Sequence, residues 1–143
     1  MKALSVKQPW AGNIAMGIKL AEIRPRKIRP QGDIVICASI NKFKGIGNFH
    51  PDTYSLWLYP NDICDYYGYA IAVVNWYNTV IFTKDLSGKA KFDSNNWPFG
   101  FNAIAGMSDQ FAWMFQNPRL IEPFQVKGQQ GLFKVDDNLI KYK

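Results

Sequence analysis

Residues 4–24 constrain the fold more than any other part of this sequence. They begin with a short apolar stretch, and Pro9 then suits the first turn of a helix, because its missing N–H would have no helical partner there. Gly17 can take a positive φ and end that helix, so we predict a helix over residues 9–16. Apolar and polar side chains then alternate over residues 20–24, as in a strand. The chain therefore opens as strand, helix, strand.

The face that this helix presents to the core follows from its spacing. Trp10, Ile14 and Ile18 recur every four residues, and Ala11 widens the apolar stripe. We expect this stripe to pack against the rest of the domain.

Most of the remaining chain predicts short strands separated by turns. We predict these strands at residues 34–39, 69–76, 110–115, 121–126 and 132–135. Thr79–Thr83 either continues the second of them or begins a turn. Pro118 should end the strand that begins at residue 110, and Pro123 should place its strand at an edge or a bulge. We also expect a short helix near residues 60–66. The fold class is thus α+β but mainly β: a small β-barrel with flanking short helices.

Length and charge bound the kind of protein. A chain of 143 residues is most simply one domain, residues 1–143. Its net charge of +6 and pI near 9.3 favour polyanionic partners. The alternative is that the charge serves solubility only. Aromatic residues, at 15%, exceed what a core of this size needs and leave some for stacking.

Other classes of site find little support. Cys37 lies in an apolar run, which indicates a buried reduced thiol, and Cys64 stands far from it. With no Cys/His cluster, and His50 as the sole histidine, we expect no metal and no cofactor. No apolar run approaches the ~20 residues that a membrane span needs. We expect a cytoplasmic monomer.

Two polar clusters flank the predicted helix. A chain reversal after the helix would bring them together into a pocket with cations, an amide, a carboxylate and an indole, a set suited to gripping a nucleotide. The candidate binding residues are Lys7, Gln8, Trp10, Lys19, Glu22 and Arg24.

Each candidate has a structural alternative. Lys19 is a phosphate clamp, a base, or a solvated lysine beside the helix end. In one alternative, Glu22 and Arg24 simply form an ion pair with each other. In the other, Glu22 accepts a hydrogen bond from a base amine and Arg24 holds a phosphate. Gln8 either reads a base edge or lies near the helix start. Trp10 stacks on a base or packs in the core.

Further contacts come from later segments. Ser39, at the end of a predicted strand, contacts a ligand or begins a turn. Lys127 and Gln129 adjoin glycines that allow close backbone approach, and they form an opposite wall or only a turn. The basic run of residues 24–29 suits phosphate tracking. Aromatic residues Trp97 and Phe99 are candidates for base stacking.

Four segments together resemble a known family. Ser5-x-Lys-Gln-Pro-Trp-Ala11, Gly17-x-Lys-x-x-Glu-x-Arg24, the strand from Gly32 to Ser39 and the segment 126–133 resemble the ASCH domain. The resemblance implies a barrel similar to the PUA superfamily, with a cleft where the Gly-x-Lys-x-x-Glu-x-Arg segment meets it. It also implies an RNA-linked role, so RNA or a nucleotide is the expected partner.

The same resemblance implies an alternative function. Some members are small amidohydrolases acting on N4-acetylated cytidine, and others have ribonuclease activity. Their catalytic lysine matches Lys19, but the threonine three residues later is replaced by Glu22. The alternative is therefore a small hydrolase, acting on a modified nucleoside amide or on RNA phosphodiesters, with Lys19 and Glu22 as catalytic residues.

Overall fold

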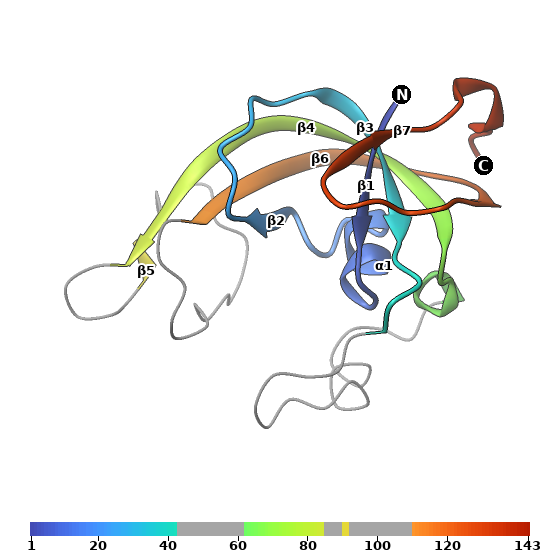
Figure 1. Cartoon of the computed structure of the whole chain (residues 1–143), viewed down its shortest axis with the longest axis horizontal. Helices are drawn as coiled ribbons and strands as arrows, with labels where there is room; N and C mark the ends of the chain where they lie inside the picture. Colours follow the sequence, from blue (N-terminus) through green and yellow to red (C-terminus); the bar gives the residue numbers. More distant parts are fainter. Residues whose placement is uncertain (43–61, 85–89, 92–109) are drawn as a thin grey trace.

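The computed structural model describes residues 1–42, 62–84, 90–91 and 110–143 (Figure 1). The elements follow the order predicted for the opening of the chain and add longer strands later. They are β1 (Lys2–Val6), α1 (Trp10–Ala15), β2 (Ala21–Arg24), β3 (Gly32–Ala38), η1 (Asp62–Asp65), β4 (Tyr69–Lys84), β5 (Ala90–Lys91), β6 (Gln110–Gln125), β7 (Leu132–Lys134) and η2 (Asp137–Leu139).

The strands form one curled sheet in the order β2-β6-β4-β3-β1-β7, with β5 paired to β4. Neighbours are antiparallel except β1 and β3, which run parallel. Figure 1 shows β4 and β6 as two long arcs lying side by side, with α1 beneath their concave side. The prediction of a mainly β, barrel-like fold with short helices is confirmed.

Helix α1 lies within one residue of the prediction at each end. Gly17 has φ 74° and its N–H donates to Ile14, so the glycine ends the helix as predicted. Ile14 and Ala11 are buried. The prediction for Ile18 is wrong: its side chain is 41% exposed, because the helix has already ended and the chain has turned.

Strand β6 corrects a second prediction. Pro118 does not end the strand, since β6 runs from Gln110 to Gln125 through both Pro118 and Pro123. The register between β4 and β6 shifts at three places, and at a bulge the extra residue needs no ladder hydrogen bond. Beyond Met114, moreover, β2 no longer pairs with β6. Proline is tolerated on such a strand. Of the two alternatives for Thr79–Thr83, the structure has the continuation, because β4 runs from Tyr69 to Lys84.

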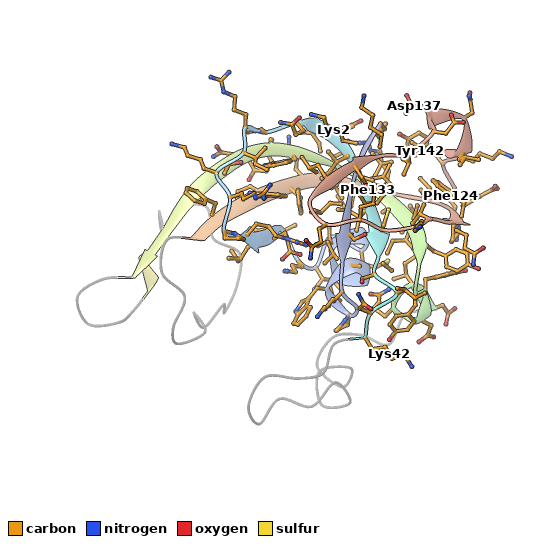
Figure 2. The ribbon with its side chains drawn as sticks, in the orientation of Figure 1. Lys2, Lys42, Phe124, Phe133, Asp137 and Tyr142 are labelled. Carbon is orange, nitrogen blue, oxygen red and sulfur yellow. The ribbon has the colours of Figure 1, made fainter. Side chains whose placement is uncertain are left out.

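The two faces of the sheet carry separate cores. On the face that α1 covers, the Trp76 and Trp113 rings stack with centroids 4.3 Å apart. Since neighbouring strand residues point to opposite faces, Val35 and Cys37 lie on the other face. There the C-terminal residues cover them, with Phe133 buried among them. Figure 2 shows Phe124, Phe133 and Tyr142 gathered on this side of the molecule.

Cys37 is buried as predicted, and both cysteines are free thiols. Burial raises the pKa of the Cys37 thiol to about 12. Burial and the nearby Asp65 carboxylate raise the pKa of the Cys64 thiol as well. Neither thiol is suited to nucleophilic chemistry, which requires a thiolate.

Within the described residues, no helix is long and apolar enough to cross a bilayer. No group of three His, Cys, Asp or Glu side chains gathers there in a way that could hold a metal ion.

Candidate functional site

The reversal after α1 brings Lys19 between Trp10 and Glu22. The Lys19 Nζ lies 3.5 Å from a Glu22 carboxylate oxygen and 5.7 Å from the centre of a Trp10 ring. Only 20% of the Lys19 side chain and 13% of the Glu22 side chain are exposed. The lysine therefore connects the start of α1 to β2 and is held in place from two sides.

The turn that positions Lys19 is closed by one backbone carbonyl. The Asn13 oxygen accepts hydrogen bonds from the N–H groups of Ile18 and Lys19, at 2.9 and 3.0 Å. The chain is thereby folded back against the end of α1. These two hydrogen bonds therefore fix the backbone at Lys19.

Strand alternation places Glu22 and Arg24 on the face of the sheet that α1 covers. Glu22 is the direct cross-strand partner of Trp113, and Arg24 that of Phe111. Trp113 belongs to the core on the α1 side. Directly opposed residues share a face, so both charged side chains point towards the concave side.

Arg24 bridges from β2 to β1. Its Nη2 donates to the Ser5 carbonyl oxygen at 2.9 Å. Strand β7 pairs with β1 only as far as Leu4, so Ser5 lies beyond the end of that ladder. The guanidinium contacts β1 beyond the end of that ladder and joins the first strand of the sheet order to the fifth.

The segment after β6 reaches the same place. A Cβ added to Gly128 would lie 2.6 Å from the Ser5 Oγ, so a larger residue at this position would have to displace the serine hydroxyl. Lys127 and Gln129 flank Gly128, and both are exposed. The structure therefore brings the backbone at Gly128 to Ser5, whose carbonyl Arg24 contacts.

Gln8 has a structural role. Its Nε2 donates to the carbonyls of Ile63 and Tyr66, at 2.8 and 2.9 Å, and its Oε1 accepts from the Gly12 N–H at 2.9 Å. The side chain is 3% exposed. The sequence left two roles open for Gln8, reading a base edge or lying near the helix start. The structure has the second, and the hydrogen bonds of the amide are made within the protein.

Lys7 and Ser39 lie at the margin of this arrangement. The Lys7 side chain is exposed and makes no hydrogen bond or ion pair with any described residue. Ser39 bonds through its N–H to the Val6 carbonyl at 2.8 Å, which places it beside the end of β1. Its hydroxyl accepts from the Asn41 N–H at 3.1 Å and begins a turn. His50, Trp97 and Phe99 lie outside the described residues.

Ser5 and Asn13 are the parts of this site that the sequence did not single out. Each contributes a backbone carbonyl, and a carbonyl leaves no signal in a sequence. Both also bury side-chain polar atoms that have no hydrogen-bond partner among the described residues. A buried serine or asparagine of this kind is recognised only once the packing around it is known.

These features define a small, basic, barrel-like β domain in which Lys19 and Arg24 lie on or just before the short strand β2. A family model for the ASCH domain matches residues 4–124. The chain belongs to the ASCH domain family. A search of curated proteins found no match.

Proposed function

We propose that this ASCH domain binds RNA, and that Lys19, Glu22 and Arg24 hold one nucleotide unit of it. The single observation that carries the proposal is the position of Lys19 between Trp10 and Glu22, because it joins the two polar clusters of the sequence into one site. The net charge of +6 supports a polyanionic partner. The RNA-linked role that the family resemblance implies agrees with this.

In this proposal Arg24 and Lys19 bind the phosphate group of the nucleotide. Arg24 uses Nη2 for the Ser5 carbonyl, and its other donors have no partner among the described residues. A guanidinium held at one end and free at the other is suited to paired hydrogen bonds with phosphate oxygens. Lys19 adds a second positive charge, with Trp10 holding its ammonium group in place.

Glu22 serves the base. A carboxylate oxygen accepts a hydrogen bond from an exocyclic amine such as N4 of cytosine. Lys19 is its ion-pair partner, so a bound nucleotide would meet an acceptor and a cation side by side. This pairing selects for a ligand that carries both an amine and a phosphate.

The test is the affinity for single-stranded RNA, measured by fluorescence anisotropy. Lys19→Ala and Arg24→Ala should each weaken binding about tenfold, the effect of removing one charge-assisted hydrogen bond of roughly 1.4 kcal/mol. Lys141→Ala, which removes an exposed lysine of the C-terminal segment, is the matched control and should leave the affinity unchanged. Thermal midpoints of all three variants should stay close to that of the wild type. Wild-type affinity in both site variants would overturn the proposal.

The second candidate is a hydrolase that acts on a nucleobase amide or an RNA phosphodiester. The 3.5 Å contact between Lys19 and Glu22 favours it, because acid–base chemistry needs two such groups within reach of one another. Lysine acts as a nucleophile or base where cations or deep burial surround it. The charged neighbour here is a carboxylate, which favours binding. Turnover of N4-acetylcytidine or RNA that is lost in Glu22→Gln, with binding retained, would establish the hydrolase instead.

A further inference from the structure

The loop between β2 and β3, residues 25–31, presents three cations to solvent. Arg26, Lys27 and Arg29 are all exposed. No acidic residue occurs between Glu22 and Asp33, and none of the three cations forms an ion pair with a described residue. A charged loop that serves solubility alone commonly mixes both signs. This one carries a single sign.

Hydrogen bonds from side chains of the sheet hold the backbone of this loop. The Trp113 Nε1 donates to the Arg26 carbonyl at 3.0 Å, and the Thr79 Oγ1 donates to the Ile28 carbonyl at 2.8 Å. Thr79 in turn accepts from the Trp76 Nε1 at 3.0 Å. The two stacked tryptophans of the core therefore direct their N–H groups at the loop, one of them through Thr79.

The end of the loop is held as well. The Gln31 Nε2 donates to the Arg29 carbonyl at 2.6 Å, while its Oε1 accepts from Lys2 on β1. Ile28 packs against the core. The carbonyls of Arg26 and Ile28 thus face the core, whereas the side chains of Arg26, Lys27 and Arg29 reach solvent.

Anchoring the loop favours binding because it lowers the conformational entropy that the loop loses when it binds a ligand. A mobile loop must lose backbone freedom when it binds, and that loss weakens the affinity. A loop already fixed by buried indoles presents its charges without this loss. Buried tryptophan N–H groups usually find a partner, but here both serve the same short loop.

We propose that residues 25–31 form a second contact surface, which binds the phosphates of the nucleotides that flank the one held by Lys19, Glu22 and Arg24. The inference rests on the proposed function and deepens it, because it makes the ligand a single-stranded oligonucleotide rather than a free nucleotide. Arg24 is the last residue of β2 and directly precedes the loop, so the two surfaces are continuous along the chain. A run of cations beside a base-binding site is the arrangement that tracks a nucleic-acid backbone.

The experiment compares two ligands, a single-stranded RNA of about ten nucleotides and a mixture of nucleoside monophosphates. The variant Lys27→Gln/Arg29→Gln should weaken oligonucleotide binding about tenfold or more at low salt. It should also reduce the slope of log affinity against log salt by about 1.4, because each phosphate that no longer meets a cation accounts for roughly 0.7. Binding of the monophosphates should not change. Lys141→Gln/Lys143→Gln removes the same charge on the other side of the molecule, where Figure 1 shows the C-terminus, and should affect neither ligand.

A charge-neutral variant tests the anchoring. Thr79→Val keeps the shape of the side chain but removes the donor to Ile28, while Trp76 retains the Asn78 carbonyl as a partner at 3.0 Å. Oligonucleotide binding should weaken several-fold with every cation still present. Wild-type oligonucleotide affinity in this variant would overturn the role of the anchor.

The remaining outcomes separate this inference from the proposed function. If the loop variant and its control have the same oligonucleotide affinity and the same salt slope, the second surface is refuted, even where Lys19→Ala still weakens both ligands. If Lys19→Ala leaves both ligands unaffected while the loop variant weakens the oligonucleotide, the proposed nucleotide site is refuted instead.

Discussion

The two sides of this sheet differ in how their charges are paired. Around the C-terminal segment two ion pairs join distant parts of the chain: the Met1 amino group pairs with Asp137, and the Arg119 guanidinium lies 2.8 Å from the Asp33 carboxylate. The Arg119 guanidinium also lies over the Tyr142 ring, 5.6 Å from its centre. On the β2 side, Lys19 pairs with Glu22, but Arg24 and the loop cations that follow have no acidic partner among the described residues. The ion pairs around the C-terminal segment join distant parts of the chain, whereas Arg24 and the loop cations keep donors available to a ligand.

This contrast predicts that substitutions on the two sides separate stability from binding. The C-terminal side should govern the free energy of unfolding and leave RNA affinity alone. The β2 side should do the reverse. Substitutions at Phe133 and Asp33 test the stability half of the contrast, and a substitution at Gln8 tests whether a residue of a candidate binding segment serves the fold instead.

The largest effect belongs to Phe133, which is 8% exposed and covers the face opposite α1. Phe133→Ala should lower the free energy of unfolding by about 3 kcal/mol, because it leaves a cavity in that core. Urea denaturation measures the loss. RNA affinity under native conditions should equal that of the wild type, and a parallel loss of affinity would break the contrast.

The next effect belongs to Gln8, which directly precedes α1 in a candidate binding segment yet serves the fold. Gln8→Ala leaves the Gly12 N–H and the carbonyls of Ile63 and Tyr66 without their partner. We expect a loss of about 2 kcal/mol in the free energy of unfolding. The exposed neighbour Lys7 provides the control, and Lys7→Ala should not alter stability. A Gln8→Ala protein with wild-type stability and weakened RNA binding would show that Gln8 contacts the RNA instead.

The smallest effect belongs to Asp33. Partial burial pushes the pKa of this carboxyl upward, but hydrogen bonds from Asn75 and Arg119 and the charge of Arg119 outweigh it, so the pKa lies below its ordinary value of 3.8. The ionised form is therefore favoured in the folded state. Its contribution to stability is complete above pH 3.8 and is lost as the pH falls through the lowered value.

Because the Asp33 side chain is 37% exposed, Asp33→Asn should cost no more than about 1 kcal/mol at neutral pH. Unfolding measured from neutral pH down to acid pH in both proteins checks this. The wild type should lose its advantage over Asp33→Asn only at the acid end. A constant difference across the whole range would contradict the assignment.

Much of the first forty residues could be predicted because the signals there are local. Pro9 and Gly17 set the limits of α1 through their own backbone preferences, and alternation over residues 20–24 set β2. The same alternation placed Glu22 and Arg24 on one face.

Local signals failed where distant strands decide the outcome. Pro118 has the features of a strand end, but β6 bulges there against β4 and continues. The role of Gln8 depends on carbonyls 55 and 58 residues away. The anchor of Arg24 is a backbone carbonyl on β1, which no residue type marks. Such contacts follow from the tertiary fold and cannot be found from spacing.

The most direct test of the central claim is to titrate a single-stranded RNA into isotope-labelled protein and follow its NMR signals. The claim predicts that the backbone amides of Lys19, Glu22 and Arg24 and the indole N–H of Trp10 shift, while those of Phe133, Asp137 and Tyr142 stay in place. Shifts confined to the C-terminal side, with the β2 signals unmoved, would contradict it.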